Sequence, residues 1–178
     1  MDAALKYMKT IKASITIFAL TLFFAVAAMS QTVLNSIDGA RIDLDAQHGK
    51  VVVLAVGASW LPLSAKQVEV TNTLAKKYAG RDVVFYFVAT DSTRQGKNFA
   101  SDDAIRKFGF TNKLSATILR DSDGLITRQK YQVDQMPSFV VLDKSGRPVA
   151  EPFGGIDGSS TSKYDITVPI SRAIDKAL

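Results

Sequence analysis

The sequence predicts an α/β domain with a central mixed sheet flanked by helices and an N-terminal β-hairpin. Two continuous apolar runs, residues 51–56 and 83–89, are typical of strands buried on both faces. Between them, apolar side chains recur at helical spacing from Pro62, whose fixed φ suits a first helical turn, to Gly80, which ends the helix. A strand, a helix and a second strand in this order form a βαβ unit with parallel strands.

The elements expected on either side of this unit are shorter. Asp38 and Gly39 separate two short alternating runs, which is a strong hairpin signal, so residues 32–44 are expected to form a β-hairpin. In chain order, the sequence then predicts a polar loop at 91–98, a helix from Ser101 that Gly109 terminates, a strand at 117–119, a surface turn at 121–124 leading into a short helix that ends near 131, an antiparallel hairpin of 138–142 with 148–153, a flexible glycine-serine connection at 158–162, and a closing helix at 168–178.

Residues 1–30 have the pattern of a secretory signal peptide, followed by the domain at 31–178. Three lysines precede an almost uninterrupted apolar stretch at 13–28, and small residues suit cleavage after Ala27 or Ser30. The alternative is an uncleaved membrane anchor, but this stretch falls short of the roughly 20 residues needed to span a bilayer. The pattern predicts an exported, periplasmic protein, with an extracellular or membrane-tethered location as the alternatives.

The residue counts exclude several kinds of chemistry. The formal net charge of +5 falls to +3 without the three lysines and one acid of the first 30 residues, and no basic block has interleaved aromatics, so no nucleic-acid partner is expected. The chain has no cysteine, which excludes disulfides and thiolate chemistry. With His48 as the only histidine, the usual metal and haem sites lack ligands, and no metal or cofactor is expected.

The stretch at 58–64, Ala-Ser-Trp-Leu-Pro-Leu-Ser, follows the first buried strand, where open α/β sheets place their ligands. It contains no cysteine, histidine or acid. Ser64 as a nucleophile would need a base in reach, and His48 lies before the strand, so Ser64 is expected to cap or line the helix start. Trp60, the only tryptophan, either forms the rim of this site or packs in the core. The turn at 121–124 lacks the later glutamate of a calcium loop.

The order of these elements, with Trp60-x-Pro62-x-Ser64 and the run Met136-Pro137-Ser138-Phe139, resembles the thioredoxin superfamily. The chain is similar to exported TlpA/ResA-type thiol-disulfide oxidoreductases and to redoxin (peroxiredoxin-like) domains. The resemblance covers about residues 33–156 and implies a thioredoxin-like fold with a cis bond before Pro137. Further local matches are Gly49-Lys50-Val51-Val52-Val53-Leu54, Ala58-Ser59-Trp60, Lys76-Lys77-Tyr78, Asp121-Ser122-Asp123-Gly124 and the turn at 143–149.

Both active-site cysteines of this family are replaced. The motif Trp-Cys-x-x-Cys reads here as Trp-Leu-Pro-Leu-Ser, which places Leu61 at the attacking thiol and Ser64 at the resolving thiol. Leucine has no group that ionises and a serine hydroxyl forms no disulfide, so dithiol exchange and cysteine-based peroxide reduction are closed to this chain. The acid that often follows the second cysteine in the TlpA branch falls near Gln67, which is uncharged.

Three functions remain open. The first is a non-catalytic protein- or peptide-binding module of the envelope, because the resemblance implies that a partner's backbone lies beside the cis-proline loop, where apolar side chains would form a patch. The second is a thiol-disulfide oxidoreductase or antioxidant that relies on a thiol-bearing partner, and the third is a structural or chaperone-like envelope component. If Leu61 and Leu63 fold inward, the surface beside the cis-proline loop is closed to a partner. In the first hypothesis another exported protein or peptide would contact Trp60, Leu61, Pro62, Leu63, Ser64, Met136 and Pro137.

Overall fold

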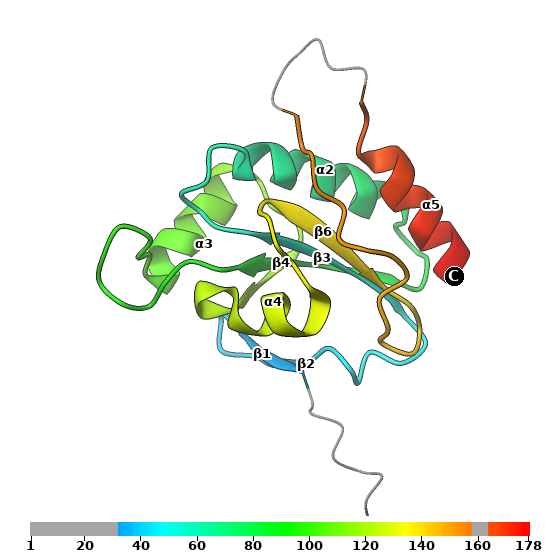
Figure 1. Ribbon diagram of the computed structural model, residues 1–178, viewed down its shortest axis with the longest axis horizontal. Coiled ribbons are helices and arrows are strands. Elements are labelled where there is room, and N and C mark those ends of the chain that lie inside the picture. Colours follow the sequence, from blue (N-terminus) through cyan, green and yellow to red (C-terminus); the bar gives the residue numbers. More distant parts are fainter. Residues whose placement is uncertain (1–31, 158–163) are drawn as a thin grey trace, which may run out of the picture. The chain divides into compact units, whose positions relative to one another are not determined.

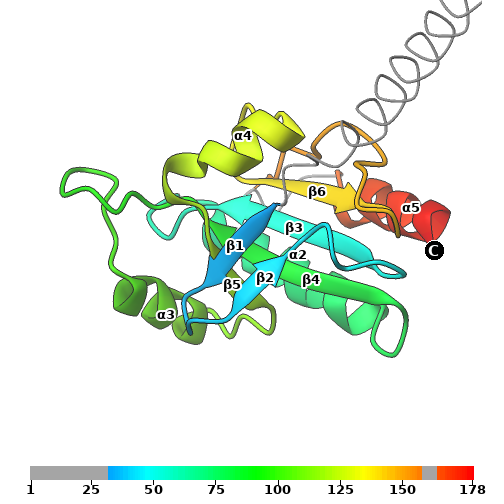
Figure 2. The ribbon, with the colours of Figure 1, turned by 90° about the horizontal axis from the view of Figure 1, so that it is seen from below.

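The computed structural model describes residues 32–157 and 164–178, and it shows a mixed six-stranded sheet in the order β2-β1-β5-β4-β3-β6 with helices on both faces (Figures 1 and 2). The predicted signal peptide and glycine-serine connection lie outside these residues. The elements are β1 (Val33–Ser36), β2 (Arg41–Asp43), β3 (Val51–Gly57), α2 (Ser64–Lys77), β4 (Val83–Ala89), α3 (Asp102–Thr111), β5 (Thr117–Arg120), the 3-10 turn η1 (Ser122–Gly124), α4 (Leu125–Tyr131), β6 (Ser138–Leu142) and α5 (Thr167–Ala177).

The strands β3 and β4 form the centre of the sheet and pair in parallel from Val51↔Val83 to Gly57↔Ala89. Every residue of β3 is buried, which explains why its sequence is a continuous apolar run rather than an alternating one. Strand β6 pairs with the other side of β3 in the antiparallel direction. The predicted βαβ unit and mixed sheet are therefore confirmed.

Alternate residues of the central strands belong to two separate cores. Val53 and Phe87 pack on the face that α2, α3 and α5 cover, whereas Leu54 and Val88 pack on the face that α4 covers. Such alternation is what a two-residue side-chain period produces when both faces are covered. Within the described residues, no helix is long and apolar enough to cross a membrane.

The N-terminal hairpin is confirmed, and it extends the sheet. Strands β1 and β2 pair in the antiparallel direction around Gly39, which has a φ of +89°. Strand β1 also pairs antiparallel with β5 through Asn35↔Arg120 and Ser36↔Leu119. The sheet is therefore antiparallel towards both of its edges and parallel only across β3, β4 and β5.

Two predicted element ends are wrong. The prediction that Gly109 terminates α3 fails, because the helix continues to Thr111 and Gly109 is buried inside it. A Cβ at Gly109 would lie 2.7 Å from the Ile118 side chain, so this glycine lets α3 approach β5 closely. Helix α2 begins at Ser64 rather than at Pro62, which lies in the turn ahead of it.

The second arm of the C-terminal hairpin is not a strand. Residues 148–153 meet β6 only at two isolated bridges, Phe139↔Phe153 and Leu142↔Pro148. Pro148 and Pro152 have no N–H to donate, which prevents a continuous ladder along this segment.

The buried phenol of Tyr131 leads to a test of how α4 packs. Its hydroxyl has no hydrogen-bond partner among the described residues, and burial raises the pKa of Tyr131 to about 12 from 10.0. Between these pH values the unfolded chain loses the proton while the folded chain keeps it, so stability is lost as the pH rises. Near pH 11 this effect should lower the free energy of unfolding of the wild type by about 1 kcal/mol, and Tyr131→Phe should not show that decrease.

Urea unfolding of wild type and Tyr131→Phe near pH 8 and pH 11 checks this expectation. Tyr164→Phe removes a phenol from a side chain that is 55% exposed and serves as the control. Equal alkaline losses in wild type and Tyr131→Phe would contradict the argument.

Candidate functional site

The loop between β3 and α2, residues 58–63, is fixed to the end of β4. The Ser59 hydroxyl donates to one carboxylate oxygen of Asp91 over 2.5 Å, and the Ser59 N–H lies 3.1 Å from both oxygens. Asp91 is fully buried and comes shortly after β4. The carboxyl ends of two neighbouring parallel strands are thus joined by a short network around one acid.

The Met136-Pro137 turn lies at the same end of the sheet. Because β6 is antiparallel to β3, its first residue, Ser138, lies opposite Val56 near the carboxyl end of β3. The peptide bond between Met136 and Pro137 is cis. The Thr90 hydroxyl lies 2.9 Å from the Gly57 carbonyl oxygen and 3.2 Å from the Met136 sulfur. These contacts connect β3, β4 and the turn before β6.

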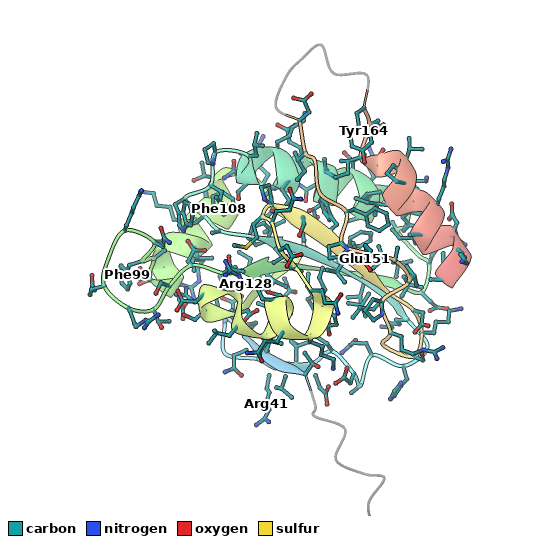
Figure 3. All side chains as sticks on the ribbon, viewed as in Figure 1. Arg41, Phe99, Phe108, Arg128, Glu151 and Tyr164 are labelled. Carbon is teal, nitrogen blue, oxygen red and sulfur yellow. The ribbon has the colours of Figure 1, made fainter. Side chains whose placement is uncertain are left out.

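A hollow of about 210 Å³ opens between these elements. Arg128 reaches it from α4, which crosses in front of the sheet in Figure 3. Trp60 is 46% exposed at this position, so it lies at the rim rather than in the core. The hollow is lined by Trp60, Thr90, Asn98, Asp123, Arg128 and Met136.

The other residues of the 58–64 stretch lie outside the lining of the hollow. Leu63 is half-buried and packs against the core beneath α2, and Leu61 is also half-buried. Pro62 is exposed. Ser64 is buried, and its hydroxyl donates to the Ala58 carbonyl oxygen over 2.7 Å, so it lines the helix start. The hollow therefore has two large apolar side chains, Trp60 and Met136, and an otherwise polar lining.

Gln67 joins β3 to β6 directly beneath this site. Its fully buried side-chain amide donates to the carbonyl oxygens of Val56 (3.1 Å) and Ser138 (2.8 Å). A Cβ at Gly57 would lie 2.3 Å from the Gln67 Oε1 atom, so the glycine leaves room for the amide. A carboxylate cannot donate these two bonds, so an acid at this position could not join the two strands in this way.

The turn at 121–124 is not the surface turn that was expected. Asp121 is buried, and its carboxylate accepts from the Ile126 N–H, the Thr127 N–H and the Thr127 hydroxyl. These bonds hold the start of α4, which carries Arg128. His48 is exposed, and the described residues contain no group of three or more His, Cys, Asp or Glu side chains that could hold a metal ion.

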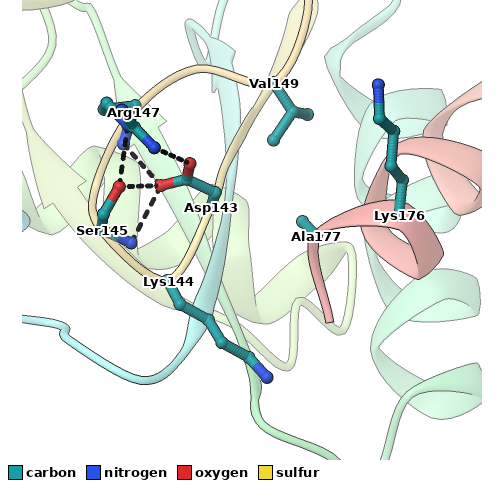
Figure 4. Close-up of a pocket in the computed structure, with 7 residues that line it drawn as sticks. All are labelled: Asp143, Lys144, Ser145, Arg147, Val149, Lys176 and Ala177. Atoms are coloured by element: carbon teal, nitrogen blue, oxygen red, sulfur yellow. Dashed lines mark hydrogen bonds and ion pairs between the residues drawn. The ribbon is translucent and has the colours of Figure 1, made fainter.

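A second, larger hollow of about 460 Å³ lies beyond the other end of β6, next to α5 (Figure 4). Asp143 lines this hollow, but its carboxylate already accepts hydrogen bonds within the tight turn. The donors are the Ser145 hydroxyl and the N–H groups of Ser145 and Arg147. These hydrogen bonds, that of the Ser145 hydroxyl first, lower the pKa of Asp143 to about 2. This hollow is lined mainly by residues of the turn after β6, so it lies at the opposite end of β6 from Met136.

The site residues that the sequence reasoning missed have different origins. Asp91 follows a predicted parallel strand, and a buried acid at that position is a signal that could have been used. For Gln67 the sequence indicates only the absence of a charge, not the hydrogen bonds that its amide donates. Asn98, Asp123 and Arg128 come from a loop, a turn and a short helix, and no shared sequence pattern connects them.

The arrangement of the strands, helices and loops defines a thioredoxin-like fold in a chain without cysteines. The chain belongs to the AhpC/TSA family, whose model matches residues 26–148. It is 29% identical over 113 residues to the thioredoxin-like protein YneN of Bacillus subtilis (strain 168). That alignment covers 64% of this chain and 62% of YneN, which is less than two thirds of the relative.

Solved structures agree on the fold. A putative thiol:disulfide interchange protein DsbE from Chlorobium tepidum has a TM-score of 0.66 and 21% identity, over 83% of this chain and 92% of its own. The pneumococcal exposed lipoprotein thioredoxin Etrx1 from Streptococcus pneumoniae strain TIGR4 has a TM-score of 0.63 and 22% identity, over 83% and 99%. A secreted Mycobacterium tuberculosis disulfide oxidoreductase has a TM-score of 0.60 and 24% identity, over 82% and 96%.

Gln67→Glu tests whether the buried amide clamps β3 to β6. A carboxylate would face two carbonyl oxygens without a donor, so the free energy of unfolding at pH 7 should fall by about 2–4 kcal/mol. The loss should shrink near pH 5, because a protonated carboxyl group donates to one of the carbonyls.

Chemical denaturation at the two pH values measures this difference. Gln95→Glu makes the same chemical change in the exposed part of the 91–98 loop and should cost little at either pH. A loss in Gln67→Glu that is equally large at both pH values would contradict a role for the amide protons.

Proposed function

We propose that this chain is a non-catalytic binding module of the cell envelope, which holds an extended segment of another exported protein, or a peptide, beside the Met136-Pro137 turn. The observation that carries the proposal is that the backbone of Met136 is unpaired among the described residues. Within the described residues, neither its N–H nor its C=O group takes part in a hydrogen bond. Backbone polar groups in folded proteins are nearly always paired, so these two are open to a strand-like partner.

The side chains around this backbone suit such a contact. Trp60 is half-exposed and lines the same hollow as Met136, so it offers a large rigid surface with a polar N–H at its edge. Leu61 is half-buried beside it and adds apolar surface. Leu63 and Ser64 turn inward. The proposed surface therefore rests on the remaining predicted residues, which are Trp60, Leu61, Pro62, Met136 and Pro137.

The rigid loop further supports a binding role. The bonds from Ser59 to Asp91 hold the 58–63 loop before any partner arrives, and the bond from Thr90 to Gly57 holds the end of β3 from which the loop starts. A site that is ordered in advance loses less conformational entropy on binding.

Export is also a part of the proposal. The signal-peptide pattern of residues 1–30 supports it, and so do similar structures described as an exposed lipoprotein and as a secreted protein. The partner would then be another exported protein, and the periplasm is the location that we favour.

The competing function is redox catalysis with thiols supplied by a partner. Leu61 and Ser64 stand where the family has its thiols, and the Ser64 hydroxyl is already bonded to Ala58. We expect the purified protein to reduce insulin and to consume peroxide no faster than a heat-denatured sample, in the presence of dithiothreitol. Turnover well above that background would overturn the non-catalytic proposal.

Binding itself is tested with fluorescein-labelled, reduced and carboxymethylated lactalbumin, a permanently unfolded chain whose segments can adopt an extended conformation on binding. We expect saturable binding by fluorescence anisotropy, and Trp60→Ala should weaken it about tenfold because a central aromatic contact is worth more than about 1 kcal/mol.

The matched control is Phe110→Ala, which removes an aromatic side chain that is 86% exposed on α3. Phe110→Ala should leave the affinity unchanged. Absence of saturable binding, or an equal effect of the two variants, would count against the proposed surface.

A further inference from the structure

The hollow between Trp60 and Met136 contains a cation without a partner. Arg128 forms no hydrogen bond or ion pair with any described residue, although its side chain lines the hollow. The neighbouring acid does not neutralise it, because the Asp123 carboxylate pairs with Arg94 at 3.4 Å. A guanidinium group presents five N–H donors in a planar arrangement that matches a carboxylate.

The remaining polar groups of the hollow are either engaged or are further donors. The Thr90 hydroxyl contacts Gly57 and Met136, and both oxygens of the nearby Asp91 accept from Ser59. The side-chain amide of Asn98 has no partner among the described residues. The hollow therefore offers one unpaired positive charge and one free amide beside the apolar walls of Trp60 and Met136.

The size of the hollow agrees with a small charged group. Its volume of about 210 Å³ is well above the roughly 10–15 Å³ that one water molecule needs, and it leaves room for a carboxyl group on a short stem. Arg128 and Asn98 are exposed, so a carboxyl group can reach them from the surface, and solvent partly screens the ion pair that it forms.

We propose that the hollow receives an acidic side chain, aspartate or glutamate, from the extended segment that binds beside Met136. This inference rests on the proposed binding function and adds a sequence preference to it. Met136 supplies both the open backbone groups and one wall of the hollow, so a residue paired with that backbone has its own side chain close to Arg128. Because side chains alternate along an extended strand, the acid should be preferred at one position and not at its immediate neighbours.

Capped peptides of about seven residues, each with one glutamate at a different position and each with a glutamine counterpart, test this preference. Isothermal titration at low salt should show one position where glutamate binds about tenfold more tightly than glutamine. In Arg128→Gln that ratio should fall to about one, whereas Arg128→Lys should keep part of it.

Arg172→Gln is the matched control, since it removes the same charge from an exposed position on α5. It should leave the tenfold ratio intact. The ratio should also shrink between about 0.05 and 0.5 M salt, because the charges are partly exposed to screening.

The outcomes separate this inference from the proposed function. If peptides bind and Trp60→Ala weakens them, but glutamate and glutamine bind equally, the acidic preference is wrong and the binding function stands. If no peptide binds at all, the proposed function fails and the inference fails with it. If N-acetylglutamate amide alone competes as well as the peptide does, the site is one for small free carboxylates and the peptide assignment is overturned.

Discussion

The side-chain amide of Gln67 is the interaction on which the geometry of the site depends. It donates to one carbonyl oxygen on β3 and one on β6, at Val56 and Ser138, just before β3 runs into the 58–63 loop and just after the Met136-Pro137 turn. Its carbonyl oxygen and the Ser138 hydroxyl have no partner among the described residues. A buried polar group that is only partly satisfied costs free energy, so the two bonds that it makes must offset that cost.

Leu61 and Ser64, which the resemblance places at the two thiol positions of the family, affect the same end of the sheet in different ways. Leu61 adds apolar surface next to Trp60, whereas Ser64 turns its hydroxyl inward to the Ala58 carbonyl oxygen. A resolving thiol has to meet an attacking one at the surface, but a serine at the first position of α2 has no such requirement. The loop thereby keeps the outline of a reactive site while its polar groups are used for internal hydrogen bonds.

The sequence predicted the parts of the fold that depend on long apolar patterns, because burial on both faces leaves a direct record in residue type. The strands β3 and β4, the helix between them and the N-terminal hairpin were all correct. The errors arose where tertiary contacts, rather than the local sequence pattern, determine the end of a helix or the burial of a turn. Gly109 has the residue type of a helix end but serves a close approach to Ile118, and Asp121 has the residue type of a surface turn but caps α4 from a buried position.

The candidate site was harder to predict than the fold. Trp60 and Met136 were expected to lie together on the strength of a family resemblance, and both line one hollow. The polar half of that hollow could not be foreseen, since Asn98, Asp123 and Arg128 are brought together only by the packing of a loop, a turn and α4 against the end of the sheet. The sequence predicted an apolar patch at this site. The structure instead shows a hollow with both apolar and polar side chains.

The buried carboxylate of Asp91 gives a physical reason to regard the loop as a contact surface. Asp91 is completely buried and forms no ion pair among the described residues, and its oxygens accept from the N–H and hydroxyl groups of Ser59. Burying a charge is expensive unless hydrogen bonds compensate for it. Here the compensation comes from the loop itself, so a rearrangement of the loop that left Asp91 buried would deprive the acid of its hydrogen-bond donors. A loop that is held at this cost has a single conformation, and a single conformation benefits the binding of an extended chain because less entropy is lost when the partner arrives.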